Sequence, residues 1–189
     1  AKWDSVTVDQ TLTFEEAVQG TRERITRAVE LRLRSDVPVA LCLSGGIDSN
    51  LILGVAKNIL GADVQPFSIV GSDSRYDESD AIQKSAEWFG VSPICKNMRG
   101  INLLDEIEEI TRFRGAPIAT ANQFALWSLM GEISSAGFKV ALSGIGADEL
   151  FSGYYDHHLY YLDEIQREHP YLADRKMTDW IQHILPLIR

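Results

Sequence analysis

The sequence predicts an α/β fold in which a parallel sheet is sandwiched by helices. Strand-like and helix-like runs alternate along all 189 residues, with no low-complexity tract and no internal repeat. Residues 38–43 are continuously apolar, which is typical of a strand that is buried on both faces in a parallel sheet. A chain of this length with 45% hydrophobic residues can bury one core, so we expect a single domain over residues 1–189.

The first helix is predicted to begin at the capping box Thr13-Phe14-Glu15-Glu16 and to run to about Ser35, because apolar residues recur there at helical spacing. After the strand at 38–43, a helix is expected from Asp48 to Leu60, where Gly61 ends it. The further elements, in chain order, are a strand at 64–70, a helix at 77–89 ended by Gly90, a short strand at 92–96, helices at 103–113 and 120–135, a strand at 139–143 and an amphipathic helix at 171–189.

Charge and composition limit the partners of the chain. The net charge is −9 and no run of Lys or Arg is present, which argues against a nucleic-acid surface. No apolar stretch approaches the length of a membrane span, and the first residues show no signal-peptide pattern. Cys42 and Cys95 lie in apolar stretches and are expected to be reduced core residues, which favours the cytoplasm.

The run Ser44-Gly45-Gly46-Ile47-Asp48-Ser49 follows the first strand directly and opens onto a helix. A glycine pair lets the backbone approach an oxyanion closely, and the start of a helix adds a favourable dipole. The run contains no lysine, unlike the common phosphate loop that ends in Gly-Lys-Ser/Thr. With one carboxylate and no cation, it suits a polyphosphate held through a bound metal, so the sequence indicates a nucleotide with magnesium. The alternative is a plain connector between a strand and a helix.

A second turn of the same kind follows the strand at 139–143, in the run Ser143-Gly144-Ile145-Gly146-Ala147-Asp148-Glu149. Ligands of open parallel sheets bind outside the carboxyl ends of the strands, where both turns would lie. If the two strands are neighbours, Asp48 and Asp148 could face one metal-bound pyrophosphate from opposite sides. The alternative for Asp148 and Glu149 is that they only offset the dipole at a helix start.

Further motifs surround the two turns: Ser35-Asp36-Val37-Pro38, FSIV at 67–70, YDES at 76–79 and LSGIGADELFSGY at 142–154. In order and spacing, residues 14–162 resemble the synthetase domain of the glutamine-dependent asparagine synthetase family. The resemblance implies the adenine-nucleotide α-hydrolase-like fold of PP-loop ATP pyrophosphatases. It also implies a ligase that adenylates a carboxylate with ATP, releases pyrophosphate with magnesium, and then transfers ammonia to give an amide, as in asparagine biosynthesis.

The resemblance also implies which residues form the site. Pyrophosphate would be held by Ser44, Gly45, Gly46, Asp48 and Ser49. The catalytic carboxylates and magnesium ligands would be Asp48 and Asp148. Adenosine would contact Leu43, Ile69, Ser143 and Gly144, of which the first two are also ordinary strand residues.

Two positions depart from the family's pattern. Ile145 stands where asparagine synthetases carry a glutamate, and an apolar side chain can neither accept a proton nor pair with an incoming amine. Arg114-Gly115-Ala116-Pro117 stands where the family usually carries an acidic residue before the proline. The acceptor therefore stays open between aspartate and another carboxylate, such as a uronic acid, a β-lactam precursor or a peptide.

Two further features concern completeness. Relatives that use glutamine carry a separate glutaminase domain, so we expect ammonia to come from a domain or subunit outside this chain. Relatives also continue past the position of Arg189 through helices that supply a catalytic lysine. We therefore expect a synthetase domain truncated at its C-terminus, whose last helix exposes an apolar stripe of Trp180, Ile184 and Leu187.

The sequence also bears on other functions and on features outside the two turns. A tRNA-modifying, GMP or NAD synthetase of the same fold is disfavoured by the acidic charge and the second motif, whereas Ile145 leaves a non-catalytic nucleotide-binding domain open. The adjacent pair His157-His158 is expected to be structural, because neighbouring side chains on a helix point about 100° apart and cannot easily chelate one metal. Four aromatic residues at core-like spacing are expected to pack in the interior: Trp88, Phe89, Phe124 and Trp127.

Overall fold

The computed structural model describes residues 9, 11–71 and 77–187. The chain forms two compact units, Ala1–Ser143 and Gly144–Arg189. The elements of the first unit are α1 (Phe14–Arg32), β1 (Val39–Cys42), α2 (Ile47–Gly54), the π-helix η2 (Val55–Ile59), β2 (Val64–Val70), α3 (Ser79–Phe89), β3 (Ile94–Asn97), α4 (Leu103–Arg114), α5 (Ala121–Ser135) and β4 (Val140–Leu142). Those of the second are α6 (Ala147–Phe151), α7 (Tyr155–Glu168), α8 (Pro170–His183) and the short 3-10 helix η3 (Leu185–Leu187).

The four strands form one sheet in the order β3-β2-β1-β4, and every pair is parallel. Val39 of β1 pairs with Val64 of β2 on one side and with Val140 of β4 on the other. The predicted parallel sheet is therefore confirmed, and so is the expectation that the strands before the two glycine turns are neighbours.

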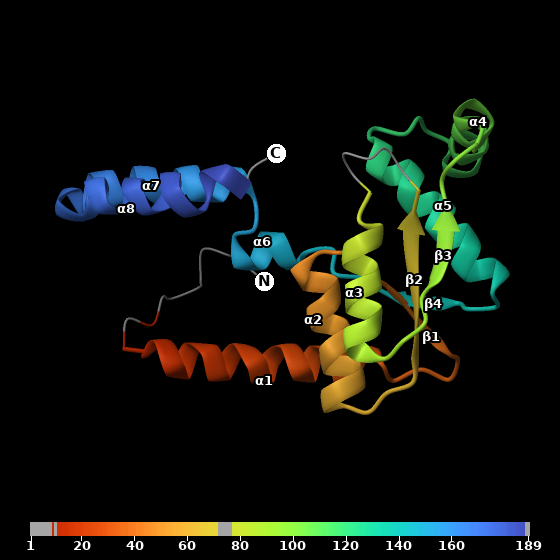
Figure 1. Cartoon of the computed structure of the whole chain (residues 1–189), viewed down its shortest axis with the longest axis horizontal. Coiled ribbons are helices and arrows are strands. Elements are labelled where there is room, and N and C mark those ends of the chain that lie inside the picture. The colour runs from red at the N-terminus through yellow and green to blue at the C-terminus, as the bar shows by residue number, and fades with distance from the viewer. Residues whose placement is uncertain (1–8, 10, 72–76, 188–189) are drawn as a thin grey trace. The chain divides into compact units, whose positions relative to one another are not determined.

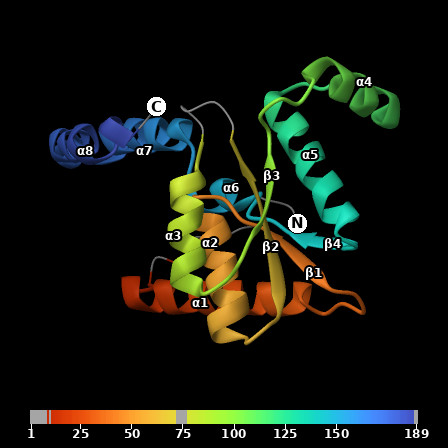
Figure 2. The same cartoon turned by 45° about the vertical axis from the view of Figure 1, so that its right-hand side comes forward.

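Helices cover both faces of this sheet, as Figures 1 and 2 show, with α2 and α3 on one side of the strands and α5 on the other. Alternate residues of β1 serve the two faces, because successive side chains of a strand point in opposite directions. Leu41 packs with Leu53 of α2 and Ile82 of α3, whereas Ala40 belongs to the cluster of Phe67 and α5. The core thus holds the carboxyl ends of β1 and β2 rigidly between two helical layers.

The helix boundaries follow the predicted signals closely. The Thr13 hydroxyl accepts a hydrogen bond from the Glu16 N–H at 3.2 Å, and the Thr13 N–H donates to Oε2 of Glu16 at 2.9 Å, which completes the predicted capping box. Gly61 and Gly90 adopt the left-handed backbone conformation that ends a helix, with φ of 63° and 59°. The predicted helix from Asp48 to Leu60 is instead an α-helix that continues as a π-helix from Val55, a change of winding that the apolar spacing did not reveal.

Two expectations about buried residues are wrong. Cys95 is exposed, because β3 is an edge strand that pairs with β2 alone. Trp88 is 82% exposed near the end of α3, although its neighbour Phe89 packs against the core. Cys42 is half-buried as a free thiol, and burial raises its pKa. Trp127 does pack, with its ring 4.9 Å from that of Phe113.

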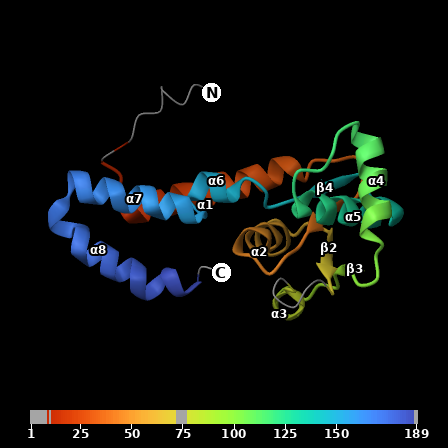
Figure 3. The ribbon, with the colours of Figure 1, turned by 90° about the horizontal axis from the view of Figure 1, so that it is seen from above.

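The second unit is helical. Its helices α7 and α8 run back along each other from a turn at His169, which Figure 3 shows from above. The rings of Tyr155 and Trp180 meet at 5.9 Å across this pair. The predicted helix to Arg189 is wrong in its end, because α8 stops at His183 shortly before Pro186, and residues 188–189 lie outside the described residues. Trp180 is half-buried, whereas Tyr171 and Ile181 are exposed.

No helix within the described part of the chain is both long and apolar enough to cross a membrane. An apolar hollow of about 530 Å³ lies between α1 and the helices α2 and η2, with Ile25, Leu51 and Val55 in its wall. Its lining contains no carboxylate. It therefore lacks the hard oxygen ligands that magnesium would need.

Candidate functional site

The candidate site begins where β1 ends. Leu43 is 3% exposed and donates its N–H to the carbonyl of Phe67 at 2.8 Å, which extends the pairing with β2 by one residue. The buried hydroxyl of Ser68 donates to the Leu43 carbonyl, also at 2.8 Å. Strand β2 therefore holds Leu43 through both its N–H and its carbonyl, and the chain leaves the sheet at a defined point.

The turn Ser44-Gly45-Gly46 is closed by hydroxyl groups. The Ser44 N–H donates to Oγ of Ser49 at 3.1 Å, and the Gly46 N–H donates to Oγ of Ser44 at 3.2 Å. The two serine hydroxyls lie 2.9 Å apart. Ser49 is 5% exposed, and its hydroxyl also contacts the carbonyls of Ser44 and Gly46. The two predicted serines therefore shape the loop from within.

Asn50 fixes the same two carbonyls from the helix side. Its Nδ2 donates to the Ser44 carbonyl at 3.1 Å and to the Gly46 carbonyl at 2.7 Å. With the carbonyls turned toward Asn50 and Ser49, the first N–H groups of α2 are left for another acceptor. No described residue accepts a hydrogen bond from the N–H of Ile47, Asp48 or Ser49. This is the arrangement that binds an anion at a helix N-terminus.

The loop lies close against the start of α3, and Gly45 makes this approach possible. A Cβ atom at position 45 would lie 2.7 Å from Cβ of Ala81, which is closer than side chains can pack. The Gly45 N–H donates to Oε2 of Glu78 at 2.9 Å, across 33 positions of sequence. The glycine is thus required by the packing of α3, in addition to any ligand.

The start of α3 is organised by Asp77. The hydroxyl and the N–H of Ser79 both donate to Oδ1 of Asp77. These two bonds, the hydroxyl first, hold the pKa of the Asp77 carboxyl below its ordinary value. Glu78, next in the chain, is placed beside the loop by this cap. Tyr76 of the YDES motif lies outside the described residues.

The second predicted loop begins beside the first. Because β4 pairs with β1 in register, Ser143 leaves the sheet at the strand next to the one that ends at Leu43. Ile69 lies in β2 on the other side of β1 and packs in the cluster of Phe67. Three of the four residues expected to contact adenosine therefore lie on three neighbouring strands, at their carboxyl ends.

The remaining predicted residues, Gly144 and Asp148, belong to the second unit. Asp148 lies in the first turn of α6, whose N-cap Gly146 has a φ of 98°. A Cβ atom at position 153 would lie 2.7 Å from Cγ of Asp148, so the carboxylate occupies space that only glycine leaves open. The Tyr154 hydroxyl donates to Oε1 of Glu149 at 2.9 Å. Asp148 is thus positioned by its own unit, independently of the sheet.

The donor set of the first loop fits magnesium held together with a phosphate ligand. No described residue donates a hydrogen bond to the Asp48 carboxylate, which lies half-buried in the first turn of α2. Within the described ranges, no group of three His, Cys, Asp or Glu side chains gathers into a protein metal cage. Magnesium in proteins is often held by only one or two carboxylates, with substrate phosphates and water completing its shell.

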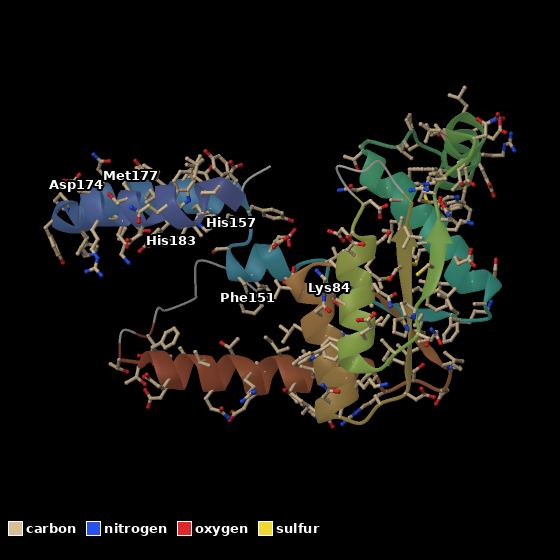
Figure 4. The ribbon with its side chains drawn as sticks, viewed as in Figure 1. Lys84, Phe151, His157, Asp174, Met177 and His183 are labelled. Carbon is tan, nitrogen blue, oxygen red and sulfur yellow. The ribbon has the colours of Figure 1, made fainter. Side chains whose placement is uncertain are left out.

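The histidine pair on α7 belongs to no group of three or more His, Cys, Asp or Glu side chains that could hold a metal among the described residues. Nδ1 of His157 is buried without a hydrogen-bond partner, and its ring packs 5.3 Å from that of Tyr154. Figure 4 labels His157 on α7 and His183 on α8 within the second unit. The expected structural role of His157 agrees with this packing.

Sequence reasoning missed three residues that shape the loops: Glu78, Asn50 and Gly153. Glu78 lies within the YDES motif, but a carboxylate that bonds a loop 33 positions earlier leaves no local pattern from which its role could be predicted. Asn50 follows Ser49 directly, and an amide side chain that can reach back one helical turn was a usable signal. Gly153 lies in the second motif but requires no left-handed backbone, so only its packing on Asp148 reveals its purpose.

An open parallel sheet with a lysine-free glycine loop at the carboxyl end of β1 defines the class of the protein: it has the PP-loop, adenine-nucleotide α-hydrolase-like fold. A solved structure of the U34-tRNA thiolase NcsA from Methanococcus maripaludis shares this fold, with a TM-score of 0.50 and 20% sequence identity over 84% of this chain and 54% of that one.

The chain belongs to the asparagine synthase family, whose model matches residues 20–184 and so spans both units. It is 34% identical over 140 residues to asparagine synthetase [glutamine-hydrolyzing] 1 of Bacillus subtilis, covering 74% of this chain and 22% of that protein. It is 33% identical over 154 residues to amidase chyE of Penicillium rubens, covering 74% of this chain and 23% of that protein. The chain therefore spans under a quarter of the length of these relatives.

Proposed function

We propose that this chain is the synthetase domain of an ATP-dependent amide-forming ligase, which adenylates a carboxylate and then transfers ammonia to it. The observation that carries the proposal is the pair of glycine turns, which leave the neighbouring strands β1 and β4 at the same edge of the sheet. The family match across both turns supports it.

In the first step, a carboxylate oxygen of the acceptor attacks the α-phosphorus of ATP. The bond between the α-phosphorus and its bridging oxygen breaks, which gives an acyl-adenylate and pyrophosphate. The chain binds the departing charge with the N–H groups of Ile47, Asp48 and Ser49 at the start of α2, which have no acceptor among the described residues. Asp48 and Asp148 would hold magnesium, which would supply counter-charge for the pyrophosphate.

In the second step, ammonia attacks the acyl carbon, AMP leaves with the bonding electron pair, and the nitrogen loses a proton to give the amide. This chemistry needs no protein nucleophile, since adenylation has already made a good leaving group. The chain's contribution is to position the reactants. The adenosine is held by Leu43, Ile69 and Ser143 at three strand ends, and by Gly144, which follows Ser143.

The acceptor is aspartate or a related carboxylate. Ile145, which replaces the family's glutamate, is 75% exposed, so the position is open to a substrate but offers it only an apolar surface. The relatives do not share one name either, since one is named an asparagine synthetase and another an amidase. We further propose that ammonia comes from a glutaminase domain or subunit outside this chain, that neither nucleic acid nor membrane is a partner, and that the free thiols of Cys42 and Cys95 fit the cytoplasm.

Exchange of labelled pyrophosphate into ATP by the complete protein tests the proposal, with aspartate, uronic acids and peptides as acceptors. Asp48→Ala is expected to lower the exchange rate on the order of a hundredfold, because the magnesium that would balance the charge of the departing pyrophosphate loses a carboxylate ligand. Asp63→Ala is the matched control, since that exposed carboxylate precedes β2 at the opposite edge of the sheet. Unchanged exchange in Asp48→Ala would remove the assigned role, and binding of ATP without exchange would indicate a non-catalytic domain.

A further inference from the structure

In the turn Ser44-Gly45-Gly46, the Gly45 N–H already donates a hydrogen bond to a negatively charged group of the protein itself. Oε2 of Glu78 lies 2.9 Å from the Gly45 nitrogen, a distance typical of a charge-assisted hydrogen bond. The Asp77 cap at the start of α3 brings Glu78 there, and the missing side chain of Gly45 allows α3 to come close. The contact is therefore built by two elements.

The other donors of the loop are arranged differently. The N–H groups of Ser44 and Gly46 donate to serine hydroxyls, which carry no charge. Those of Ile47 and Asp48 have no acceptor among the described residues. Gly45 is thus the position in this loop where a carboxylate stands in for an oxyanion of a ligand.

The charges at this loop disfavour a bare polyphosphate. The Glu78 carboxylate is hydrogen-bonded to the loop, and Asp48 lies in the first turn of α2, which follows the loop directly. No lysine or arginine occurs between Ser44 and Asn50 to offset them. An incoming pyrophosphate without a cation would meet two like charges at short range, and both would repel it.

We propose that Glu78 is the specificity residue that makes this loop accept metal-bound polyphosphate and reject the metal-free form. The proposal rests on the proposed function, because it assumes that the loop binds pyrophosphate. A magnesium ion on the ligand cancels the repulsion from Glu78, and the side chain then yields the Gly45 N–H to a phosphate oxygen. Without the metal, the Glu78 carboxylate keeps that donor and competes with the ligand.

Calorimetric titration of inorganic pyrophosphate, with magnesium and with a chelator in its place, tests the proposal on the complete protein. Glu78→Gln is expected to bind metal-free pyrophosphate about tenfold more tightly than the wild type, while the affinity for magnesium pyrophosphate changes much less. Glu78→Asp keeps the charge and should keep the preference for the metal complex. Glu87→Gln, on the same helix and exposed, removes an equal charge away from the loop and should leave both affinities unchanged.

The amide NMR signal of Gly45 supplies a readout independent of affinity and of turnover. In the wild type it should shift when magnesium pyrophosphate replaces Glu78 as its acceptor, and Glu78→Gln should start from a different position. An equal preference for the metal complex in wild type and Glu78→Gln would overturn the inference alone. Failure of the wild type to bind magnesium pyrophosphate at all would overturn the proposed function and this inference with it.

Discussion

Gly153 shows how a single residue can serve a site without touching a ligand. A Cβ atom at this position would lie 2.7 Å from Cγ of Asp148 and 3.1 Å from its Cβ. The Asp148 side chain would have to turn away, because these atoms are its own and the backbone around position 153 is fixed by the bond from its N–H to the Asp148 carbonyl at 3.1 Å. The glycine therefore holds open the place of a proposed magnesium ligand.

We expect Gly153→Ala to weaken magnesium-dependent pyrophosphate binding on the order of tenfold while the protein stays folded. Calorimetry gives the affinity, and circular dichroism reports the fold. Gly131→Ala in α5 is the matched control, since a Cβ there meets no atom within 4 Å and alanine favours a helix. Equal binding by both variants would show that Asp148 does not need this space.

At the residue scale, sequence reasoning succeeded where a local pattern carries the information. Gly61, Gly90 and the Thr13 capping box follow from short-range signals, and the structure confirms them. It failed for Trp88 and Cys95, because burial depends on which strand lies at the edge and on which face of a helix is covered. Neither is visible in the spacing of apolar residues.

Strand β2 is the element on which the sheet depends most directly. Its Phe67 is fully buried at 0% exposure, pairs with Cys42 of β1 and Ile94 of β3, and meets the ring of Phe138 edge-on at 5.3 Å. We expect Phe67→Ala to lower the free energy of unfolding by about 3–5 kcal/mol, because the cavity opens between the sheet and α5.

Unfolding in urea measures this loss. Trp88→Ala is the aromatic control: with its side chain 82% exposed, it should change the free energy of unfolding by less than about 0.5 kcal/mol. Comparable losses in the two variants would mean that the packing of α5 on β2 is not what stabilises the sheet.

The hydrogen bonds at the start of helix α3 should depend on pH. Ser79 donates two hydrogen bonds to the ionised Asp77, so the pKa of Asp77 is lower in the folded chain than in the unfolded one. A group with a lowered pKa stabilises the fold above its unfolded pKa, and the contribution is lost as the pH falls through the folded value. The cap at the start of α3, and with it the placement of Glu78, should therefore weaken only in acid.

Carbon-detected NMR titration of the Asp77 carboxyl checks this. Its midpoint should lie below that of an ordinary aspartate, and Ser79→Ala should move it upward. A midpoint for Asp77 that Ser79→Ala leaves unmoved would contradict the cap as described.

At the element scale, the order and type of the predicted helices and strands are confirmed, since a βα alternation with continuous apolar strands admits few other arrangements. The winding of η2 and the end of α8 were missed. The first depends on hydrogen-bond register, which side-chain spacing does not record. The second was readable from Pro186, which has no N–H with which to continue the α-helical hydrogen bonds.

For the whole molecule, the predicted site residues are distributed over the two compact units. Ser44 to Ser49 and Ser143 belong to the first unit, and Asp148 belongs to the second. The family match spans the two units, which supports a function that needs both. From the sequence alone, it was only a condition of the prediction that the two glycine turns leave neighbouring strands. The pairing of β1 with β4 fulfils this condition.

The central claim is that Asp48 and Asp148 hold one magnesium pyrophosphate together. A double-mutant cycle on the affinity for magnesium pyrophosphate, with Asp48→Asn, Asp148→Asn and both, measures this most directly. Each single variant should weaken binding on the order of tenfold or more, and the double variant should bind about as weakly as the weaker single one. Losses that simply multiply in the double variant would show that the two carboxylates act at independent sites and would contradict the account.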